Sequence, residues 1–415
     1  MDGTIVKDKL KREQSFNPLP YLIYIAAFAA IAAAIYLAGK VPDMVSGALG
    51  TYLPTLIRYV AIFAATGLIM IGAYKLQIWL GAKREAATGR TLVLPWVLGF
   101  IIFQVFTIGA SFYLSFTEYN LFRAPEWIGM ENYQELFDLQ VVPLESRTQR
   151  SSDALPRGYS EVQRVEIGDG GFIFGAREED FWRSMRLTVV YAVITVPLGL
   201  IASLGVALLL NQNVRGLSLW RVLFYLPAVL PAIATLLLWR WIFSSTGLLN
   251  STLTPLYRLA GINSPNWLTD PGLILPVFII ISLWGVFGAG SVILLAGLKG
   301  IPKDLYEAAS IDGAGEWAKF RHVTIPMLSP ALFYNLVTGL IGALQVFEAA
   351  AFIPIPASVG TFLNWQIYQE AFTLRNMGMA SAMAWIMLLM ILALTAMVFR
   401  SSAAWVFYQG AQEDN

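Results

Sequence analysis

The sequence predicts an all-α polytopic membrane protein with eight transmembrane helices. Hydrophobic residues make up 57% of its 415 residues and charged residues only 13%, and the mean hydropathy is +0.62. A soluble surface could not cover so many apolar side chains. The apolar residues also form runs of about 20, the length that a helix needs to cross the hydrocarbon core with its backbone groups paired. Lipid is therefore the predicted solvent for most of the chain.

Eight segments are long and apolar enough to cross a bilayer. The second is the weakest, because Arg58 and Lys75 interrupt it. A further uncharged stretch, residues 349–369, is interrupted by Pro354 and Pro356, so we expect a span end that runs into an external or re-entrant loop. The predicted spans are residues 21–39, 54–80, 94–116, 184–210, 222–243, 273–298, 331–353 and 381–400.

Lysine and arginine residues predict the orientation of these spans. They are concentrated before the first span and in alternate loops, and cytoplasmic loops carry such an excess. The long segment 117–183 is exempt, because long loops cross the membrane regardless of charge. Both termini are therefore predicted to be cytoplasmic. The residues that mark the cytoplasmic side are Lys7, Lys9, Lys11, Arg12, Lys83, Arg84, Arg90, Arg215, Arg221, Lys299, Lys303, Lys319 and Arg321.

Several classes of function are excluded by composition. The chain has no cysteine and a single histidine, His322, so disulfides, thiolate chemistry and a histidine-rich metal site are not expected. A net charge of +1 gives no basic surface for nucleic acid. No glycine-rich loop ends in Gly-Lys-Ser or Gly-Lys-Thr, so this chain has no means to cradle nucleotide phosphates. We expect no catalytic site in the chain.

Residues 300–330 are predicted to form two short helices in a cytoplasmic loop. Pro302 suits the first turn of one helix, Gly313 permits a sharp break, and Pro326 is expected to end the second helix. An amphipathic connector on the membrane surface has the same pattern, so the pattern alone leaves both interpretations open. An apolar stripe on the second helix consists of Trp317, Phe320 and Val323.

Three motifs in this loop resemble the EAA loop of bacterial ABC importer permeases: Glu307-Ala308-Ala309, Asp312-Gly313-Ala314 and Val323-Thr324-Ile325-Pro326. The usual leucine and isoleucine are replaced by Ile325 and Val323, which have similar volumes. The resemblance implies that the first helix docks into a cytoplasmic ATPase, with Glu307 offering its carboxylate to a basic group. Gly313 would set the angle between the helices, and we expect it to have a positive φ. The residues implied in ATPase coupling are Glu307, Ala308, Ala309, Asp312, Gly313 and Pro326.

Further segments resemble sugar permeases of the maltose and glycerol-phosphate transporter group. Together with the EAA loop, they extend the resemblance over roughly residues 93–138 and 181–400. An eight-span form is similar to the larger permease of maltose-type importers. The segments are residues 181–211, 221–243, 266–271 and 377–400.

This resemblance implies the fold of a type I ABC importer transmembrane domain. Residues 1–92 would contain a cytoplasmic N-terminus and two accessory helices. Residues 93–400 would form a six-span core, with a small external insert at about 139–180 between the third and fourth spans and the EAA coupling loop at 299–330. Residues 401–415 would be a cytoplasmic tail.

The implied function is that of a permease subunit in a binding-protein-dependent importer of an oligosaccharide or related polyol. The implied partners are a second permease, two ATPase subunits, an extracytoplasmic substrate-binding protein and membrane lipid. The chain itself would hold no cofactor, and ATP and Mg would be bound by the ATPase subunits. The implied location is the bacterial or archaeal cell (inner) membrane, and the implied mechanism is alternating access.

Four polar residues are candidates for the substrate pathway. Glu348 is the one carboxylate that clearly lies within a predicted core span, Gln345 would share its helical face, and Ser282 and Trp284 lie in the preceding span. These groups suit sugar hydroxyls, but they could equally bond across helices for packing. No lysine or arginine lies in the middle of a core span, which favours a neutral saccharide; Arg240 lies near a predicted external end.

Another feature of the pathway reduces the expected number of sugar contacts. Ala228 and Ala232 stand where the maltose type offers aromatic and hydroxyl groups. Substrate recognition is therefore expected to lie mostly in the partners.

The external insert is predicted to contain a small β-hairpin. Residues 162–167 alternate, Gly170-Gly171 could turn the chain, and residues 172–174 could pair back. A segment of about 40 residues has a marginal core of its own, so it is expected to lean on its neighbours. It could contact the binding protein or be a tolerated insertion, and the sequence leaves both open.

Two other classes of transport protein remain as alternatives. A permease for a non-sugar solute, such as a peptide or an amino acid, would share the same motifs. An ion-coupled secondary transporter would need buried carboxylates in several spans, and Glu348 alone is too few.

Overall fold

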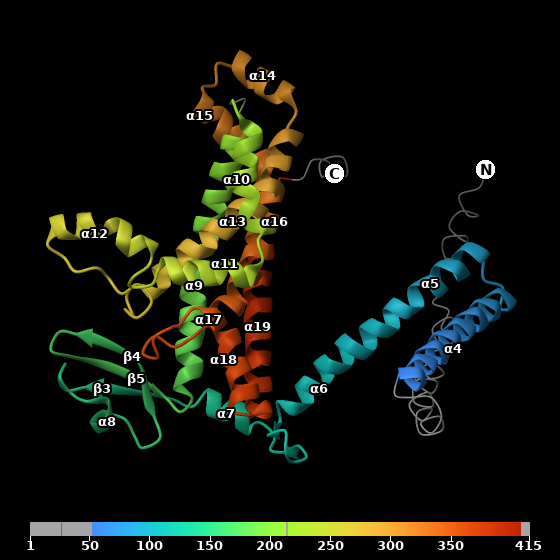
Figure 1. Cartoon of the computed structure of the whole chain (residues 1–415), viewed down its shortest axis with the longest axis horizontal. Helices are drawn as coiled ribbons and strands as arrows, with labels where there is room; N and C mark the ends of the chain where they lie inside the picture. The colour runs from blue at the N-terminus through green and yellow to red at the C-terminus, as the bar shows by residue number, and fades with distance from the viewer. Residues whose placement is uncertain (1–25, 27–51, 213–214, 408–415) are drawn as a thin grey trace. The chain divides into compact units, whose positions relative to one another are not determined.

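The computed structural model describes residues 26, 52–212 and 215–407, which divide into two units, Met1–Ala110 and Ser111–Asn415 (Figure 1). The first predicted span, residues 21–39, and the basic N-terminal residues lie outside the described residues. Five helices of the described residues are long and apolar enough to cross a membrane, or six if one bent pair is counted as a span. The count of eight therefore stays a prediction.

The first unit contains the second predicted span and most of the third. Helix α4 covers Tyr52–Trp79 and packs against α5, Arg84–Phe100, where Gln77 Nε2 donates a 3.4 Å hydrogen bond to Thr91 Oγ1. The chain continues without a break through a π-helical turn, η1 (Ile101–Val105), into α6, Phe106–Leu114. The third span thus begins ten residues before the predicted start at residue 94.

Four long helices form the bundle of the second unit: α9 (Glu179–Leu210), α13 (Ile274–Gly300), α16 (Ile325–Leu344) and α19 (Met377–Ser402). Their apolar sequences bury large side chains in two clusters. Between helices in a membrane, small residues allow close backbone approach. The buried side of α9 carries such residues: Ser184, Thr188, Thr195, Gly199 and Ser203.

The predicted span at 222–243 is not one continuous helix, and as a span it stays a prediction. It is divided into α10 (Leu217–Val229) and α11 (Ala232–Ile242), which meet at an angle of 101°. Pro231 causes the break, because a proline restricts the residue before it to extended backbone, and Leu230 has φ −70° and ψ 142°. Helix α12, Leu248–Ala260, follows.

Pro326 does not end the second short helix of the loop, as the sequence predicted. Helix α15 (Glu316–Lys319) continues through a π-helical turn, η2 (Phe320–Thr324), into α16. Pro326 is tolerated because it directly follows this π-helical turn: the Ile325 N–H bonds to the Phe320 carbonyl five residues back, so the α-helical ladder is already interrupted where proline lacks an N–H. The loop and the penultimate span therefore form one continuous rod.

The predicted hairpin in the insert is confirmed, and it belongs to a three-stranded antiparallel sheet. Strands β4 (Ser160–Ile167) and β5 (Gly170–Ala176) pair as expected, and β3 (Leu139–Leu144), which the sequence did not predict, lies on the other side of β5. Leu144, Leu155 and Ile173 form its small core.

The sheet leans on the first turns of α9, where Arg183 Nη2 donates a 2.6 Å hydrogen bond to the Glu161 carbonyl and Arg186 bonds to Gln163. Helix α14 (Lys303–Ile311) lies with α15 at the opposite end of the bundle (Figure 1). We call these two ends the sheet end and the α14 end.

Short elements complete the sheet end. The chain enters through β1 (Thr117–Glu118), β2 (Glu126–Trp127) and α7 (Glu131–Leu136), and α8 (Ser151–Ala154) packs on the sheet. After α16, the chain forms α17 (Glu348–Phe352), α18 (Leu363–Tyr368) and a π-helical turn, η3 (Gln369–Thr373), before α19 begins.

An acidic cluster also lies at the sheet end. Burial, and after it the nearby carboxylates of Glu370, Glu135 and Asp180, raise the pKa of Glu178 to about 7. Burial also raises the pKa of Glu370, whose side chain is 6% exposed, while a hydrogen bond from Asn376 opposes this shift. The surroundings at the junction of α7, α9 and η3 thus make both acids harder to ionise than an ordinary glutamate.

The start of α19 packs tightly under β1, and Gly378→Ala tests this contact. A Cβ at Gly378 would lie 2.0 Å from the Thr117 carbonyl oxygen, which also accepts a 3.1 Å hydrogen bond from Asn132 Nδ2. The backbone would have to move, so we expect a loss of about 1 to 3 kcal/mol and a lower melting temperature of the purified complex. Gly205→Ala in α9, where a Cβ meets nothing within 4 Å, is the matched control and should not lower it.

Glu178→Gln tests the acidic cluster. A glutamate whose pKa is raised in the folded state adds stability below its unfolded pKa, and this stability is lost as pH rises through about 7. The melting temperature of the wild-type complex should therefore fall between pH 5 and pH 8 by an amount that corresponds to about 2 to 3 kcal/mol.

The Glu178→Gln variant should show a flatter profile than the wild type. Glu145→Gln, a change on the exposed edge of the insert, should leave the wild-type profile as it is. If the melting temperature of Glu178→Gln falls with pH as steeply as that of the wild type, Glu178 is not the source of the pH dependence.

Candidate functional site

The α14 end presents the residues of the EAA-like loop. Glu307 and Ala308 are exposed on α14, and Ala309 is half-buried. Tyr306 fixes α14 to the rod below it through a 3.0 Å hydrogen bond between its hydroxyl and Thr324 Oγ1. One face of α14 is thus tied to the bundle and the other is open.

Gly313 ends α14 in the left-handed conformation. Its φ is +77°, which confirms the backbone expected for this glycine, and the Ala314 N–H donates a 2.9 Å hydrogen bond to the Ala309 carbonyl. Asp312 precedes it as an exposed C-terminal residue of the helix. Pro326 lies apart from these exposed residues, half-buried in the first turn of α16.

Large apolar side chains are exposed beside this turn. Ile311 is 87% exposed and Trp317 is 72% exposed, and the Trp317 ring stacks on Phe320 with centroids 5.5 Å apart. Lys319 forms a 3.0 Å ion pair with Glu316. His322 Nδ1 lies 3.0 Å from the Ala318 carbonyl, which fits a local packing role. The loop therefore exposes a carboxylate, a small residue and large apolar side chains.

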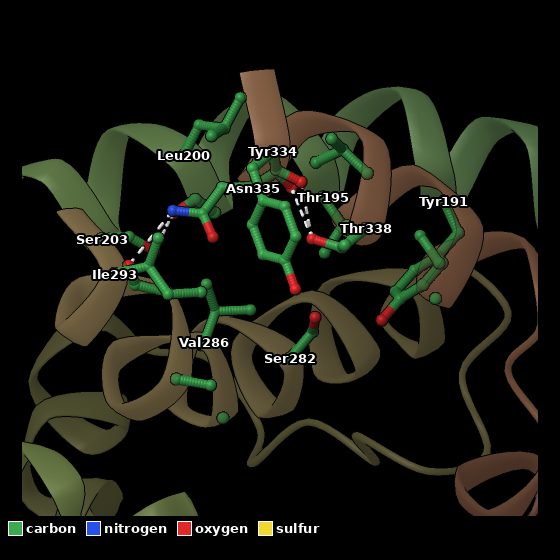
Figure 2. Close-up of a pocket in the computed structure, with 18 residues that line it drawn as sticks. Tyr191, Thr195, Leu200, Ser203, Ser282, Val286, Ile293, Tyr334, Asn335 and Thr338 are labelled. Carbon is green, nitrogen blue, oxygen red and sulfur yellow. Dashed lines mark hydrogen bonds between the residues drawn. The ribbon is translucent and has the colours of Figure 1, made fainter. Parts of the chain in front are cut away.

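A cavity of about 580 Å³ lies between α9, α13 and α16 (Figure 2). Glycines on all three helices line it, and a Cβ at Gly285 or Gly342 would meet nothing within 4 Å. Figure 2 shows the Tyr334 side chain extending from α16, with its hydroxyl directed toward α13, the helix that carries Ser282. The polar residues that line the cavity are Tyr191, Thr195, Ser203, Ser282, Tyr334, Asn335 and Thr338.

The polar groups of the cavity are uncharged. Asn335 Nδ2 donates a 3.1 Å hydrogen bond to the Gly290 carbonyl, which leaves its amide oxygen available, and the Thr338 hydroxyl donates to the Tyr334 carbonyl. Among the described residues, no acidic or basic side chain lines this cavity. It can therefore bind hydroxyl groups by exchanging hydrogen bonds, but it offers no counter-charge to an ion.

The structure separates the four residues predicted for the substrate pathway. Ser282 lines the cavity, whereas Trp284 packs against Trp239 of α11 with ring centroids 5.8 Å apart. Gln345 and Glu348 do not share a helical face, so that expectation is wrong: α16 ends at Leu344, and α17 begins at Glu348 after a turn. Both side chains are exposed outside the cavity lining.

The sequence analysis missed most of the hydroxyl groups of the cavity. Tyr191 and Thr195 lie one helical turn apart, as do Tyr334 and Thr338. Polar residues at i and i+4 in an apolar run fall on one helical face, and this spacing could have identified them.

Comparisons with known proteins agree with this architecture. Residues 172–405 match the family described as binding-protein-dependent transport system inner membrane component. The probable ABC transporter permease protein YesP of Bacillus subtilis is 34% identical over 340 residues, which cover 80% of this chain and 95% of that protein. The lactose transport system permease protein LacF of Rhizobium radiobacter is 31% identical over 56% of this chain and 79% of that protein.

A solved structure shares the fold. A chain of a bacterial ABC transporter involved in the import of the acidic polysaccharide alginate superposes with a TM-score of 0.61 at 20% identity, over 79% of this chain and 99% of that chain. The chain described here belongs to the family of binding-protein-dependent transport system inner membrane components: it is a multi-pass, non-enzymatic permease subunit of an ABC importer, which acts with ATPase subunits and a substrate-binding protein.

Proposed function

We propose that this chain is the permease subunit of an importer that carries a neutral oligosaccharide or related polyol across the cell (inner) membrane. The observation that carries the proposal is the uncharged, hydroxyl-lined cavity between α9, α13 and α16. A saccharide presents hydroxyl groups that both donate and accept, which the Tyr, Ser, Thr and Asn side chains there can satisfy. The name of the lactose permease, whose substrate is an uncharged sugar, supports the same class of solute.

Other solutes fit the cavity less well. A zwitterionic amino acid would bring two charges into a site where the described residues supply none, at a large cost in desolvation. Ion-coupled secondary transport would need ionisable groups in the pathway for the same reason. Ser282 keeps its proposed role in substrate contact, while Trp284, Gln345 and Glu348 receive no support from their positions.

The α14 end is proposed to face the cytoplasm and to dock on an ATPase subunit. There Glu307 offers a carboxylate, and the small side chains of Ala308 and Ala309 allow a partner to approach the helix closely. Asp312 and Gly313 form the turn that ends the helix. A charge-assisted hydrogen bond from Glu307 to a basic group of the ATPase would contribute about 1.5 to 3 kcal/mol. Both termini would then be cytoplasmic.

Two cavity-lining helices connect this loop to the substrate. Helix α14 follows directly on α13, and α15 continues through η2 into α16. A push on the loop therefore reaches two of the three walls of the cavity. Reversing the populations of the two access states takes about 5.5 kcal/mol of differential binding. ATP and Mg bound by the ATPase subunits would supply this free energy and so drive alternating access.

Gly313→Ala tests the coupling role. Alanine is strained at a φ of +77°, so the turn between α14 and α15 should change and uptake should fall at least about fivefold relative to ATP hydrolysis. Gly315→Ala, at an ordinary φ of −71° and with nothing within 4 Å of its Cβ, is the matched control. The measurement is the ratio of substrate uptake to ATP hydrolysis in proteoliposomes. Equal ratios in the wild type and both variants would remove the coupling role of this turn.

Tyr334→Phe tests the cavity. The importer is reconstituted with its second permease, ATPase subunits and binding protein, and uptake of neutral oligosaccharides is measured. Loss of one hydroxyl partner should lower the rate at limiting substrate about 5-fold to 10-fold, which corresponds to about 1 to 1.5 kcal/mol. Tyr113→Phe on α6 makes the same chemical change outside the cavity and should leave the rate unchanged. If the wild type takes up amino acids or ions but no saccharide, the proposed function is wrong.

A further inference from the structure

A second cavity, of about 420 Å³, lies at the sheet end of the same bundle. Its walls come from the first turn of α9, the last turn of α11, the chain that follows α17, and α18 with η3. Its polar lining includes Asp180, Arg240, Gln366 and Gln369, and Trp365 adds an indole. This chemistry differs from that of the membrane cavity, where the described lining carries no charge.

Gln366 brings an unpaired amide to this cavity. Its side chain is only 7% exposed, and its amide makes no hydrogen bond to any described residue. Neither atom of this amide is among the fully buried polar atoms of the described residues that lack a partner, so the amide reaches accessible space. Since Gln366 lines the cavity, a bound molecule there could supply the partner.

The two charged residues of the cavity are also free to bind. Neither Asp180 nor Arg240 belongs to an ion pair among the described residues. Arg240 Nη1 makes one long hydrogen bond, 3.4 Å, to the Phe352 carbonyl. A guanidinium that donates, a carboxylate that accepts and two amides that do both can hold a pair of adjacent hydroxyls. The opposite charges balance, so the set suits a neutral saccharide.

The position of this cavity places it in series with the membrane cavity. Along α9, Asp180 precedes Tyr191, the first cavity residue of that helix, by about 16 Å at 1.5 Å per residue. On the other wall, Ala343 lines the membrane cavity and Ala350 lines the second one. The same elements thus pass both cavities, one after the other.

We propose that this second cavity is an entry subsite, which holds the saccharide between its release from the binding protein and its arrival in the membrane cavity. The inference rests on the proposed function, because it assumes that a saccharide is carried. It adds Gln366, Gln369, Arg240 and Asp180 as residues that contact the substrate before it enters the membrane.

A single introduced cysteine tests the subsite, because the chain has no cysteine of its own. The Gln369→Cys importer, assembled with cysteine-free partner subunits in nanodiscs and without the binding protein, is treated with a methanethiosulfonate reagent in the presence of maltotriose, lactose or arabinotriose. A saccharide that the importer transports should slow modification at least about fivefold when it is present at several times its dissociation constant. Thr148→Cys, exposed on the insert at the same end, should be modified at an unchanged rate.

Separate outcomes decide the two proposals. Uptake of the same three saccharides by the wild-type importer with its binding protein tests the proposed function: if none is taken up, that function fails on this panel. The entry subsite is overturned if a saccharide that is taken up does not protect the cysteine at position 369. It is also overturned if that saccharide slows the modification of Gln369→Cys and Thr148→Cys equally. Omission of the binding protein excludes protein docking as the cause of protection.

A second variant checks that protection comes from binding in the cavity. Adding Gln366→Leu should raise the concentration of saccharide needed for half-maximal protection about 5-fold to 20-fold, because the amide partner is removed. An unchanged concentration would contradict the role of Gln366. Thr361→Cys, which lines the same cavity, replaces Gln369→Cys if that variant does not assemble.

Discussion

The close approach of α9 and α13 is the contact on which the rest of the second unit depends. In hydrocarbon, helices gain little from burying apolar surface, so they associate where small residues bring backbones together. Gly199 lies against Val286, and Gly290 lies so near Ser203 that a Cβ there would overlap its hydroxyl. Because α16 packs on the same pair, this approach also sets the width of the membrane cavity.

The apolar runs predicted the long elements well, because a span must satisfy its own backbone and so appears in the sequence as an uninterrupted stretch. Helices α9, α13 and α19 follow the predicted ranges closely. Two of the departures from the predicted elements occur at prolines. Pro231 breaks a predicted span by 101°, whereas Pro326 leaves a helix intact. Whether a proline breaks a helix or is tolerated in it depends on the backbone of the neighbouring turn. The residue types alone do not reveal that backbone.

The site was predicted less completely than the fold. The positive φ of Gly313 was expected from its place in a motif, since few other residues adopt that conformation. Tyr334, Asn335 and Thr338 were missed because each is a single polar residue in an apolar run, and only packing shows which of them meet at one cavity. Gln345 and Glu348 were wrongly grouped because the helix between them was assumed to continue.

The π-helical turn at Phe320–Thr324 carries a consequence for how the loop is aimed. Each residue of an α-helix advances the direction of its side chains by about 100°. Because a π turn holds one extra residue, each side chain on the far side of the turn points about 100° away from where an uninterrupted α-helix would place it. The face of α15 that carries Trp317 is thus set by residue count in the turn, independently of the side chains that line the cavity. A single-residue deletion there would remove the surplus residue of the turn and leave a plain α-helix, with α15 and the α16 wall of the cavity keeping their relative orientation.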